Sequence, residues 1–264
     1  MPRTRLPAAA TSLAVISWAA LTALMPAQAA SASAPTSCAA ADARAPKVIV
    51  ELYTSEGCSS CPPADAWLAA LPRDGSVLAL AFHVDYWDSL GWADRFADPA
   101  YTDRQRQLQA SSGARFVYTP QLIVGGRDFP GWRQLPAAAL ASTAPAWPAD
   151  APSLHLRREG AELVADIGAG GSGALAGYWA LLEDGHQSQV AAGENSGRAL
   201  RHEHVVRRYQ PVAAWPAGQA HRASWALPGV SAGHAAQAVF VLTDAPGGRP
   251  LRALQITLAG GAGC

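Results

Sequence analysis

The stretch SEGCSSCPPAD, residues 55–65, decides the fold prediction, because it places Cys58 and Cys61 at the junction of two different patterns. Before it, KVIVELYT (47–54) is a β-branched apolar run of the kind that forms a strand buried on both faces. After it, PPADAWLAALPR (62–73) has apolar residues at helical spacing and two prolines where a first helical turn tolerates them. The sequence therefore predicts a strand, a loop with two cysteines and a helix.

Three further segments continue this alternation of strands and helices. They are a strand at SVLALAFHVDYW (76–87), a helix at DPAYTDRQRQLQASSG (98–113) and a strand at VYTPQLIVGGRDF (117–129). We expect the helix to begin near Pro99 and to end near Gly113, and the last strand to be entered through Thr119 and Pro120. Strands and helices in this order predict an α/β layer domain, which we place at residues 46–145.

Beyond residue 145 the pattern changes. Closely spaced prolines prevent a helix in residues 146–153 and predict a linker. From residue 154 to residue 264, short alternating segments are separated by Gly, Pro and Asp, as in SLHLRREGAELVADI (153–167). Roughly six or seven short strands in this region predict a small all-β, sandwich-like domain.

Residues 1–30 have the three parts of a signal peptide: a basic start, an apolar middle and the small-residue sequence AQA at 27–29. The alternative is an uncleaved anchor, since the apolar part approaches the length of about 20 residues that crosses a bilayer. Cleavage predicts a periplasmic or secreted protein with an N-terminal tail at 31–45 and no membrane segment. The chain has 20 basic and 20 acidic residues, so no clustered positive charge indicates a nucleic-acid partner.

The cysteine pair by itself is compatible with redox chemistry, with metal binding or with a structural disulfide. At a helix N-terminus, partial positive charge favours the thiolate, so Cys58 would attack a disulfide and Cys61 would resolve the product. Zinc needs more ligands at suitable spacing, and His202 and His204 are expected to be ordinary strand residues. We predict no metal site or cofactor, with copper on the thiol pair and His83 as the alternative.

Glu51 is the one charge in the apolar run before the pair, seven residues ahead of Cys58. It is either buried near the cysteines, where it would exchange their protons, or exposed at a strand edge.

The segment HVDYWDSLGWADRF (83–96) is rich in aromatic and acidic residues. We expect it to form a binding rim beside the cysteines or an aromatic-packed cap. Its candidate residues are Asp85, Tyr86, Trp87, Asp88, Trp92 and Asp94. Glu194 and Asn195 are as readily explained as turn residues.

The chain resembles the thioredoxin-like superfamily in three places: VIVELYT, Cys58-Ser59-Ser60-Cys61 at the head of a helix, and Thr119-Pro120. The resemblance implies that Cys58 is the nucleophile, Cys61 the resolving thiol, and Pro120 a cis-proline that helps to hold an extended substrate. Glu51 resembles the buried acid of that superfamily, with one extra residue before the first cysteine.

A wider resemblance involves ELYTSEGCSSCPPAD, LALAFHVDYWDSLGWADRFADPAYTDRQ, VYTPQLIVGG and GENSGRALRHEHVVR. It is to a bacterial family of exported thioredoxin-like proteins catalogued as domain of unknown function 1223. The match implies the fold more strongly than the reaction.

Cys38 and Cys264 stand near the two ends of the mature chain, and they either pair with each other or remain free. The predicted function is that of a thiol-disulfide oxidoreductase acting on protein thiols or disulfides with a redox partner that the sequence does not identify. The alternative is a binding protein without enzymatic activity, in which the cysteine pair is a structural disulfide or holds copper.

Overall fold

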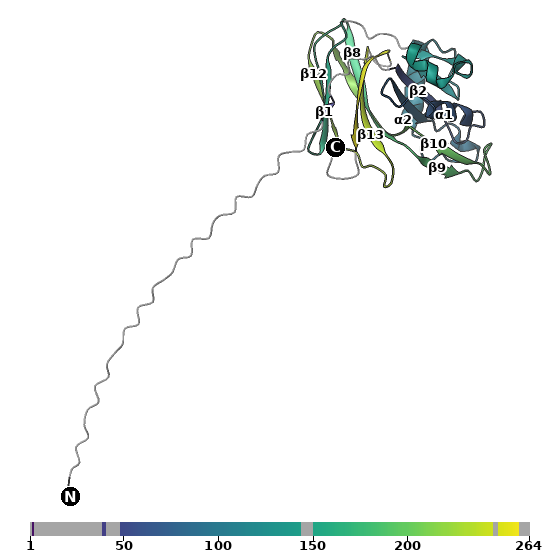
Figure 1. The fold of residues 1–264 in the computed structure, drawn as a ribbon, viewed down its shortest axis with the longest axis horizontal. Coiled ribbons are helices and arrows are strands. Elements are labelled where there is room, and N and C mark those ends of the chain that lie inside the picture. Colours follow the sequence, from purple (N-terminus) through teal and green to yellow (C-terminus); the bar gives the residue numbers. More distant parts are fainter. Residues whose placement is uncertain (1, 3–38, 41–47, 144–149, 245–247, 259–264) are drawn as a thin grey trace. The chain divides into compact units, whose positions relative to one another are not determined.

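The computed structural model describes residues 2, 39–40, 48–143, 150–244 and 248–258. It is a mixed α/β protein with one large mixed sheet, two smaller antiparallel sheets and few helices (Figure 1). The described residues from 39 to 258 belong to one compact unit. The predicted signal peptide and both Cys38 and Cys264 lie outside the described residues.

The large sheet has eight strands in the order β14-β13-β8-β11-β3-β2-β4-β5. Its strands are β2 (Val48–Thr54), β3 (Val77–His83), β4 (Gln121–Val124), β5 (Arg127–Asp128), β8 (Ala174–Glu183), β11 (Val205–Pro216), β13 (Ala236–Asp244) and β14 (Pro250–Leu258). β2 and β3 are parallel, and β4 runs antiparallel to β2. These three strands confirm the strands predicted on either side of the first helix and after Pro120.

The helices cover both faces of β2 and β3. The described part of the chain has two α-helices, α1 (Pro62–Ala69) and α2 (Pro99–Ser112), and three short 3-10 helices, η1 (Asp88–Leu90), η2 (Pro130–Gln134) and η3 (Ala137–Thr143). Val50 and Leu52 of β2 share an apolar cluster with Leu68 of α1, whereas Ile49 shares another with Leu108 of α2. Alternate residues of β2 therefore face different helices, as the period of a strand requires.

The helix α2 has clear signals at both ends. The side chain of Asp98 accepts a hydrogen bond from the Ala100 N–H at 2.9 Å, and Gly113 ends the helix with a φ of 83°. An N-cap carboxylate satisfies a free N–H of the first turn, and glycine adopts this left-handed conformation without strain. The predicted bounds of this helix are confirmed.

The second half of the chain completes the large sheet. β11 pairs in parallel with β3 at Val205 and Ala81, and antiparallel with β8 along most of its length. The sequence did not predict this shared sheet. The predicted boundary at 146–153 remains a prediction, because residues 144–149 lie outside the described part of the chain.

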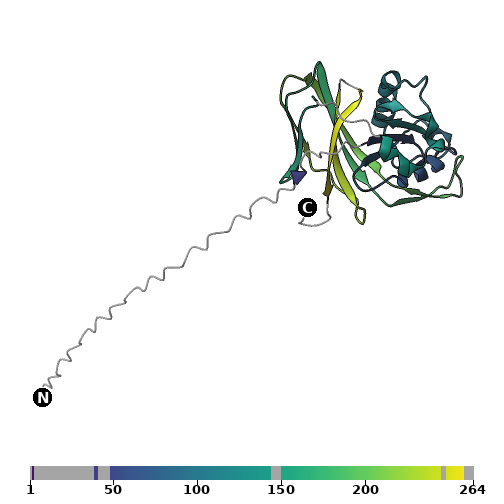
Figure 2. The same cartoon turned by 45° about the horizontal axis from the view of Figure 1, so that its top comes forward.

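A four-stranded sheet packs on the part of the large sheet that is formed by β8, β13 and β14 (Figure 1 and Figure 2). Its strands are β1 (Ala39–Ala40), β6 (Leu154–Glu159), β7 (Glu162–Ile167) and β12 (His221–Ala226). Leu156 and Leu163 of this sheet share a buried cluster with Trp179 and Phe240 of the large sheet. The remaining strands, β9 (His186–Gln189) and β10 (Ala199–His202), form a hairpin. No helix in the described ranges has the length and apolar character needed to cross a membrane.

Candidate functional site

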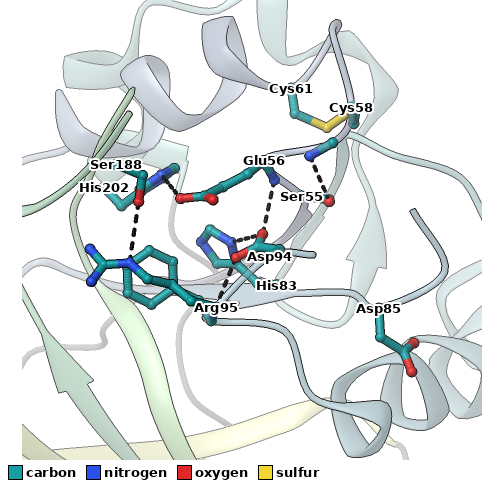
Figure 3. A network of polar contacts seen from close by, with 12 residues as sticks. Ser55, Glu56, Cys58, Cys61, His83, Asp85, Asp94, Arg95, Ser188 and His202 are labelled. Atoms are coloured by element: carbon teal, nitrogen blue, oxygen red, sulfur yellow. Dashed lines mark hydrogen bonds and ion pairs between the residues drawn. A yellow bond between two sulfur atoms is a disulfide. The ribbon is translucent and has the colours of Figure 1, made fainter. Parts of the chain in front are cut away.

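A disulfide joins Cys58 and Cys61 at the N-terminus of α1, directly after β2 (Figure 3). We call residues 55–61, between β2 and α1, the cysteine loop. Its own backbone holds it in shape, because the Cys58 N–H donates to Ser55 O at 3.2 Å and the Cys61 N–H donates to Cys58 O at 3.1 Å. Both cysteines are 0 % exposed. The two serines between them are exposed. Only the middle of the motif therefore reaches the surface.

A buried ion pair beneath the cysteine loop joins His83, the last residue of β3, to Asp94 in the segment that follows this strand. His83 Nδ1 is 2.6 Å from Asp94 Oδ2, and both side chains are 0 % exposed. Burial opposes ionisation of both groups, but their mutual attraction and hydrogen bond outweigh it. The pKa of His83 is consequently raised and that of Asp94 lowered. Each partner therefore stabilises the charged form of the other.

Glu56 extends this network toward the second half of the chain. Its N–H donates to Asp94 Oδ2 at 2.9 Å, and its carboxylate contacts His202 Nε2 at 3.0 Å and Trp92 Nε1 at 2.7 Å. Burial opposes ionisation, but the hydrogen bonds from His202 and Trp92 help to hold the pKa of Glu56 below its ordinary value. Figure 3 shows Glu56 with the disulfide on one side and Asp94 and His202 on the other.

Asp65 is a carboxylate beside the cysteines that the sequence analysis missed. It is four residues after Cys61 on α1, and residues at this spacing share one helix face. Burial raises the pKa of Asp65, while the nearby His202 and His83 act in the opposite direction. The spacing of a carboxylate one turn after the second cysteine was visible in CPPAD and was the signal for it.

Asp65 also borders a pocket of about 470 Å³ between α1 and β10. The other charged residues of its lining are Arg198, Arg201 and Glu203. On the buried side, His83 Nε2 and His202 Nδ1 have no hydrogen-bond partner among the described residues. Asp65 therefore borders this pocket and is also close enough to His83 and His202 for their charges to influence its pKa.

The turn between β9 and β10 contacts the cysteine loop directly. Asn195 Nδ2 donates to Glu56 O at 2.9 Å and to Cys58 O at 3.0 Å. The Ser59 N–H donates to the Glu194 carboxylate at 3.0 Å. The sequence analysis treated Glu194 and Asn195 as ordinary turn residues, and the only signal for them was their place in the wider family resemblance.

Trp87 connects the cysteine loop with the segment that contains Thr119 and Pro120, which we call the proline loop. Its Nε1 donates to Thr119 Oγ1 at 2.8 Å, and a Cβ added to Gly57 would be 3.0 Å from Trp87 Cβ. The Thr119–Pro120 peptide bond is cis, as the resemblance implied. Trp87 thus contacts both Gly57 of the cysteine loop and Thr119, and the substrate-binding role of these residues remains a prediction.

The other residues of the 83–96 segment divide into two groups. Asp85 accepts from Thr102 Oγ1 at 2.5 Å and Tyr86 donates to Gln105 at 3.2 Å, so both are tied to α2. Figure 3 shows Asp85 apart from the network around Glu56. Asp88, in contrast, accepts from the Asp94 N–H at 3.1 Å. The segment therefore packs as a cap on one side and supports the cysteine loop on the other.

Glu51 is buried, but the structure does not bring it to the cysteine pair. Its carboxylate accepts from Arg104 Nη2 at 2.6 Å, from Tyr178 OH at 2.6 Å and from Tyr53 OH at 2.9 Å. These partners lie on the α2 face of β2, whereas the cysteines lie at the head of α1 on the other face. Neither predicted position of Glu51, beside the cysteines or at an exposed edge, describes its place.

The two histidines considered as metal ligands do not face the same way. His202 ends β10 and contacts Glu56, whereas His204 has a φ of 57° and its N–H donates to Asp184 at 2.7 Å. The break in the strand after His202 separates the two imidazoles. Within the described ranges, no group of three or more His, Cys, Asp and Glu side chains is arranged to hold a metal. The copper alternative remains a prediction.

Comparison with known proteins identifies a family to which the chain is related. A family model described as a protein of unknown function, DUF1223, matches residues 49–242. The chain belongs to this family. The DUF1223 match includes both cysteines and the β9–β10 hairpin, so the two halves of the site are parts of one family unit.

Among solved structures, a protein from Agrobacterium tumefaciens determined by structural genomics is 28 % identical. That match covers 81 % of this chain and 95 % of the other chain, with a TM-score of 0.59. HBP35 of Porphyromonas gingivalis is 14 % identical over 82 % of this chain and 76 % of its own, with a TM-score of 0.49. No curated protein matches the sequence.

Proposed function

We propose that this DUF1223 protein is an exported, thioredoxin-like thiol-disulfide oxidoreductase that acts on protein disulfides through Cys58 and Cys61. The observation that carries the proposal is a disulfide at the start of α1 with buried carboxylate and imidazole groups beneath it. The order β2, α1, β3, α2, β4 and the cis bond before Pro120 support the thioredoxin-like part. Export rests on the sequence of residues 1–30.

In the reduced protein, the partial positive charge at the N-terminus of α1 favours the thiolate of Cys58, and Ser60 Oγ lies 3.4 Å from Cys58 Sγ. This thiolate attacks a substrate disulfide, forms a mixed disulfide and releases one substrate thiolate. Cys61 then loses its proton and attacks the sulfur of Cys58. The Cys58–Cys61 bond forms, the bond to the substrate breaks, and the second substrate sulfur leaves as a thiolate. The protein pair is oxidised and the substrate disulfide is reduced, and the reverse sequence oxidises a substrate dithiol.

Asp65, rather than Glu51, is suited to accept the proton of Cys61. It is on the same helix face as Cys61, and burial raises the pKa of Asp65, which makes its carboxylate a better proton acceptor. The pocket between α1 and β10 gives this proton a route to solvent. Glu51 is already bonded to Arg104 and two tyrosines on the other face of the sheet.

A second candidate function is that of a binding protein in which Cys58–Cys61 is a structural disulfide. The complete burial of both cysteines favours it, because reactive disulfides are usually reachable.

The reduction potential of the Cys58–Cys61 pair separates the two functions. Equilibration with glutathione or dithiothreitol buffers, followed by thiol alkylation and mass measurement, gives this potential. A value below about −300 mV indicates a structural disulfide and rejects the oxidoreductase. Insulin reduction by the wild type, and its loss in Cys58→Ser, is the result expected of the enzyme. Purified Cys58→Ser that reduces insulin at the wild-type rate would also reject it.

A further inference from the structure

The turn that joins β9 to β10, residues 190–198, is attached to the cysteine loop by polar contacts from two adjacent residues. Asn195 donates one hydrogen bond on each side of Gly57, to Glu56 O and to Cys58 O. Glu194 accepts the N–H of Ser59. The two side chains thus bind backbone groups that lie 135 to 139 residues earlier in the chain. We call residues 190–198 the hairpin turn.

Asn195 is itself rigidly placed. It is 0 % exposed, and its Oδ1 accepts a hydrogen bond from Arg198 at 2.8 Å, which orients the amide toward the cysteine loop. Val190, at the start of the turn, is 1 % exposed. Most of the other residues of the hairpin turn, from 191 to 198, are exposed. The hairpin turn is thus a surface segment that is fastened mainly at Val190 and Asn195.

The burial of Cys58 makes these fastenings relevant to reactivity. Thiol-disulfide exchange needs the incoming sulfur to approach the attacked sulfur directly. A cysteine that is 0 % exposed offers no such approach, so at least one segment packed on its loop has to move. Two neighbours of the cysteines are themselves held in place: Trp87 donates a hydrogen bond to Thr119, and Glu56 contacts His202 in the buried network. Outside the cysteine loop itself, the hydrogen bonds that the described residues make to the backbone of Cys58 and Ser59 come from the hairpin turn.

We propose that Asn195 and Glu194 are positioning residues that hold the Cys58–Ser59 peptide in its closed arrangement, and that release of the hairpin turn admits a substrate to Cys58 Sγ. This inference rests on the proposed function, because only a disulfide that exchanges with substrates has to be reached. The turn then selects substrates, since a large protein disulfide needs it to open more fully than a small reductant does.

The rate of disulfide reduction by the phosphine TCEP tests the inference, with intact mass after alkylation as the readout. We expect Asn195→Ala to be reduced about tenfold faster than the wild type, because two hydrogen bonds that keep the turn closed are lost. Glu194→Ala should be faster by about threefold, since it loses one exposed bond. Glu162→Ala, an exposed carboxylate at the start of β7, is the matched control and should match the wild type.

Removal of a buried amide can also destabilise the protein, so the unfolding midpoint of each variant is measured alongside. If Asn195→Ala does not fold, Glu194→Ala decides the question, because this residue is exposed and not part of the core. Wild-type reduction rates in the folded variants would overturn the inference. TCEP reports access whatever the natural substrate is. A wild type that fails to exchange with insulin therefore rejects the proposed function without changing the outcome of this test.

Discussion

Glu56 and His202 are 146 residues apart in the chain, yet their side chains meet at 3.0 Å and are almost completely buried. Glu56 stands two residues before Cys58, and His202 ends the hairpin that comes from the second half of the chain. The cysteine loop is therefore supported by both halves of the protein. This contact links the chemistry proposed for the pair to the stability of the whole fold.

Replacing His202 with Ala should be strongly destabilising, by about 3 to 5 kcal/mol, because it leaves the buried carboxylate of Glu56 without its imidazole partner. Urea unfolding followed by tryptophan fluorescence measures this loss. The double variant Glu56→Gln, His202→Ala should recover part of it, since no unpaired charge is then buried. A loss below 1 kcal/mol would contradict the paired arrangement.

The His83–Asp94 pair should give stability a defined pH dependence. His83 has a raised pKa, so its contribution is complete below its unfolded value of 6.5 and is lost as the pH rises through the folded pKa. Asp94 has a lowered pKa, so its contribution is present above 3.8 and is lost as the pH falls through the folded pKa. The free energy lost in Asp94→Asn should therefore be greatest between pH 3.8 and 6.5. A difference that is independent of pH from 3 to about 9 would rule out this pair as its source.

Asp65→Asn should raise stability at neutral pH while it impairs the second step of exchange. A carboxyl group with a raised pKa favours the folded state when protonated, and this contribution declines as the pH rises from 3.8 through the folded pKa. Stopped-flow mixing of the reduced protein with a peptide disulfide separates attack by Cys58 from resolution by Cys61. We expect resolution to slow by about 10²-fold and attack to change little. Asp103→Asn, an exposed carboxylate on α2, is the control.

Glu51→Gln should destabilise the protein by about 3 kcal/mol, because it leaves Arg104 buried without its counter-charge. The reduction potential of the cysteine pair should remain close to the wild-type value, since Glu51 faces α2. Unfolding in urea and equilibration with glutathione measure the two quantities on the same preparation. A shift of the potential by more than about 30 mV, equivalent to a tenfold change in its equilibrium constant, would return Glu51 to a redox role.

Local patterns were sufficient for the first half of the fold. The apolar run before Cys58, the prolines after Cys61 and the polar helix between Asp98 and Gly113 all form the elements that they predict. Each depends on neighbouring residues, through strand burial, helix capping and the fixed φ of proline. The cis bond before Pro120 also agrees with the family resemblance.

The polar site was less predictable because a strand places successive side chains on opposite faces. Glu51 had the right charge at nearly the right distance from Cys58, but its position in the alternation directs it to Arg104 and Tyr178. Asp65 was the better candidate, and the helical repeat of four residues after Cys61 was enough to find it.

What the sequence alone determined was the cysteine motif, the elements on either side of it and the membership of its family. Only the tertiary structure decided which groups surround the motif. Strand pairing of β11 with β3 and of β10 with β9 brings Asn195 and His202 to the cysteine loop. Such contacts depend on sheet order and register over more than 130 residues, and no local pattern encodes that order.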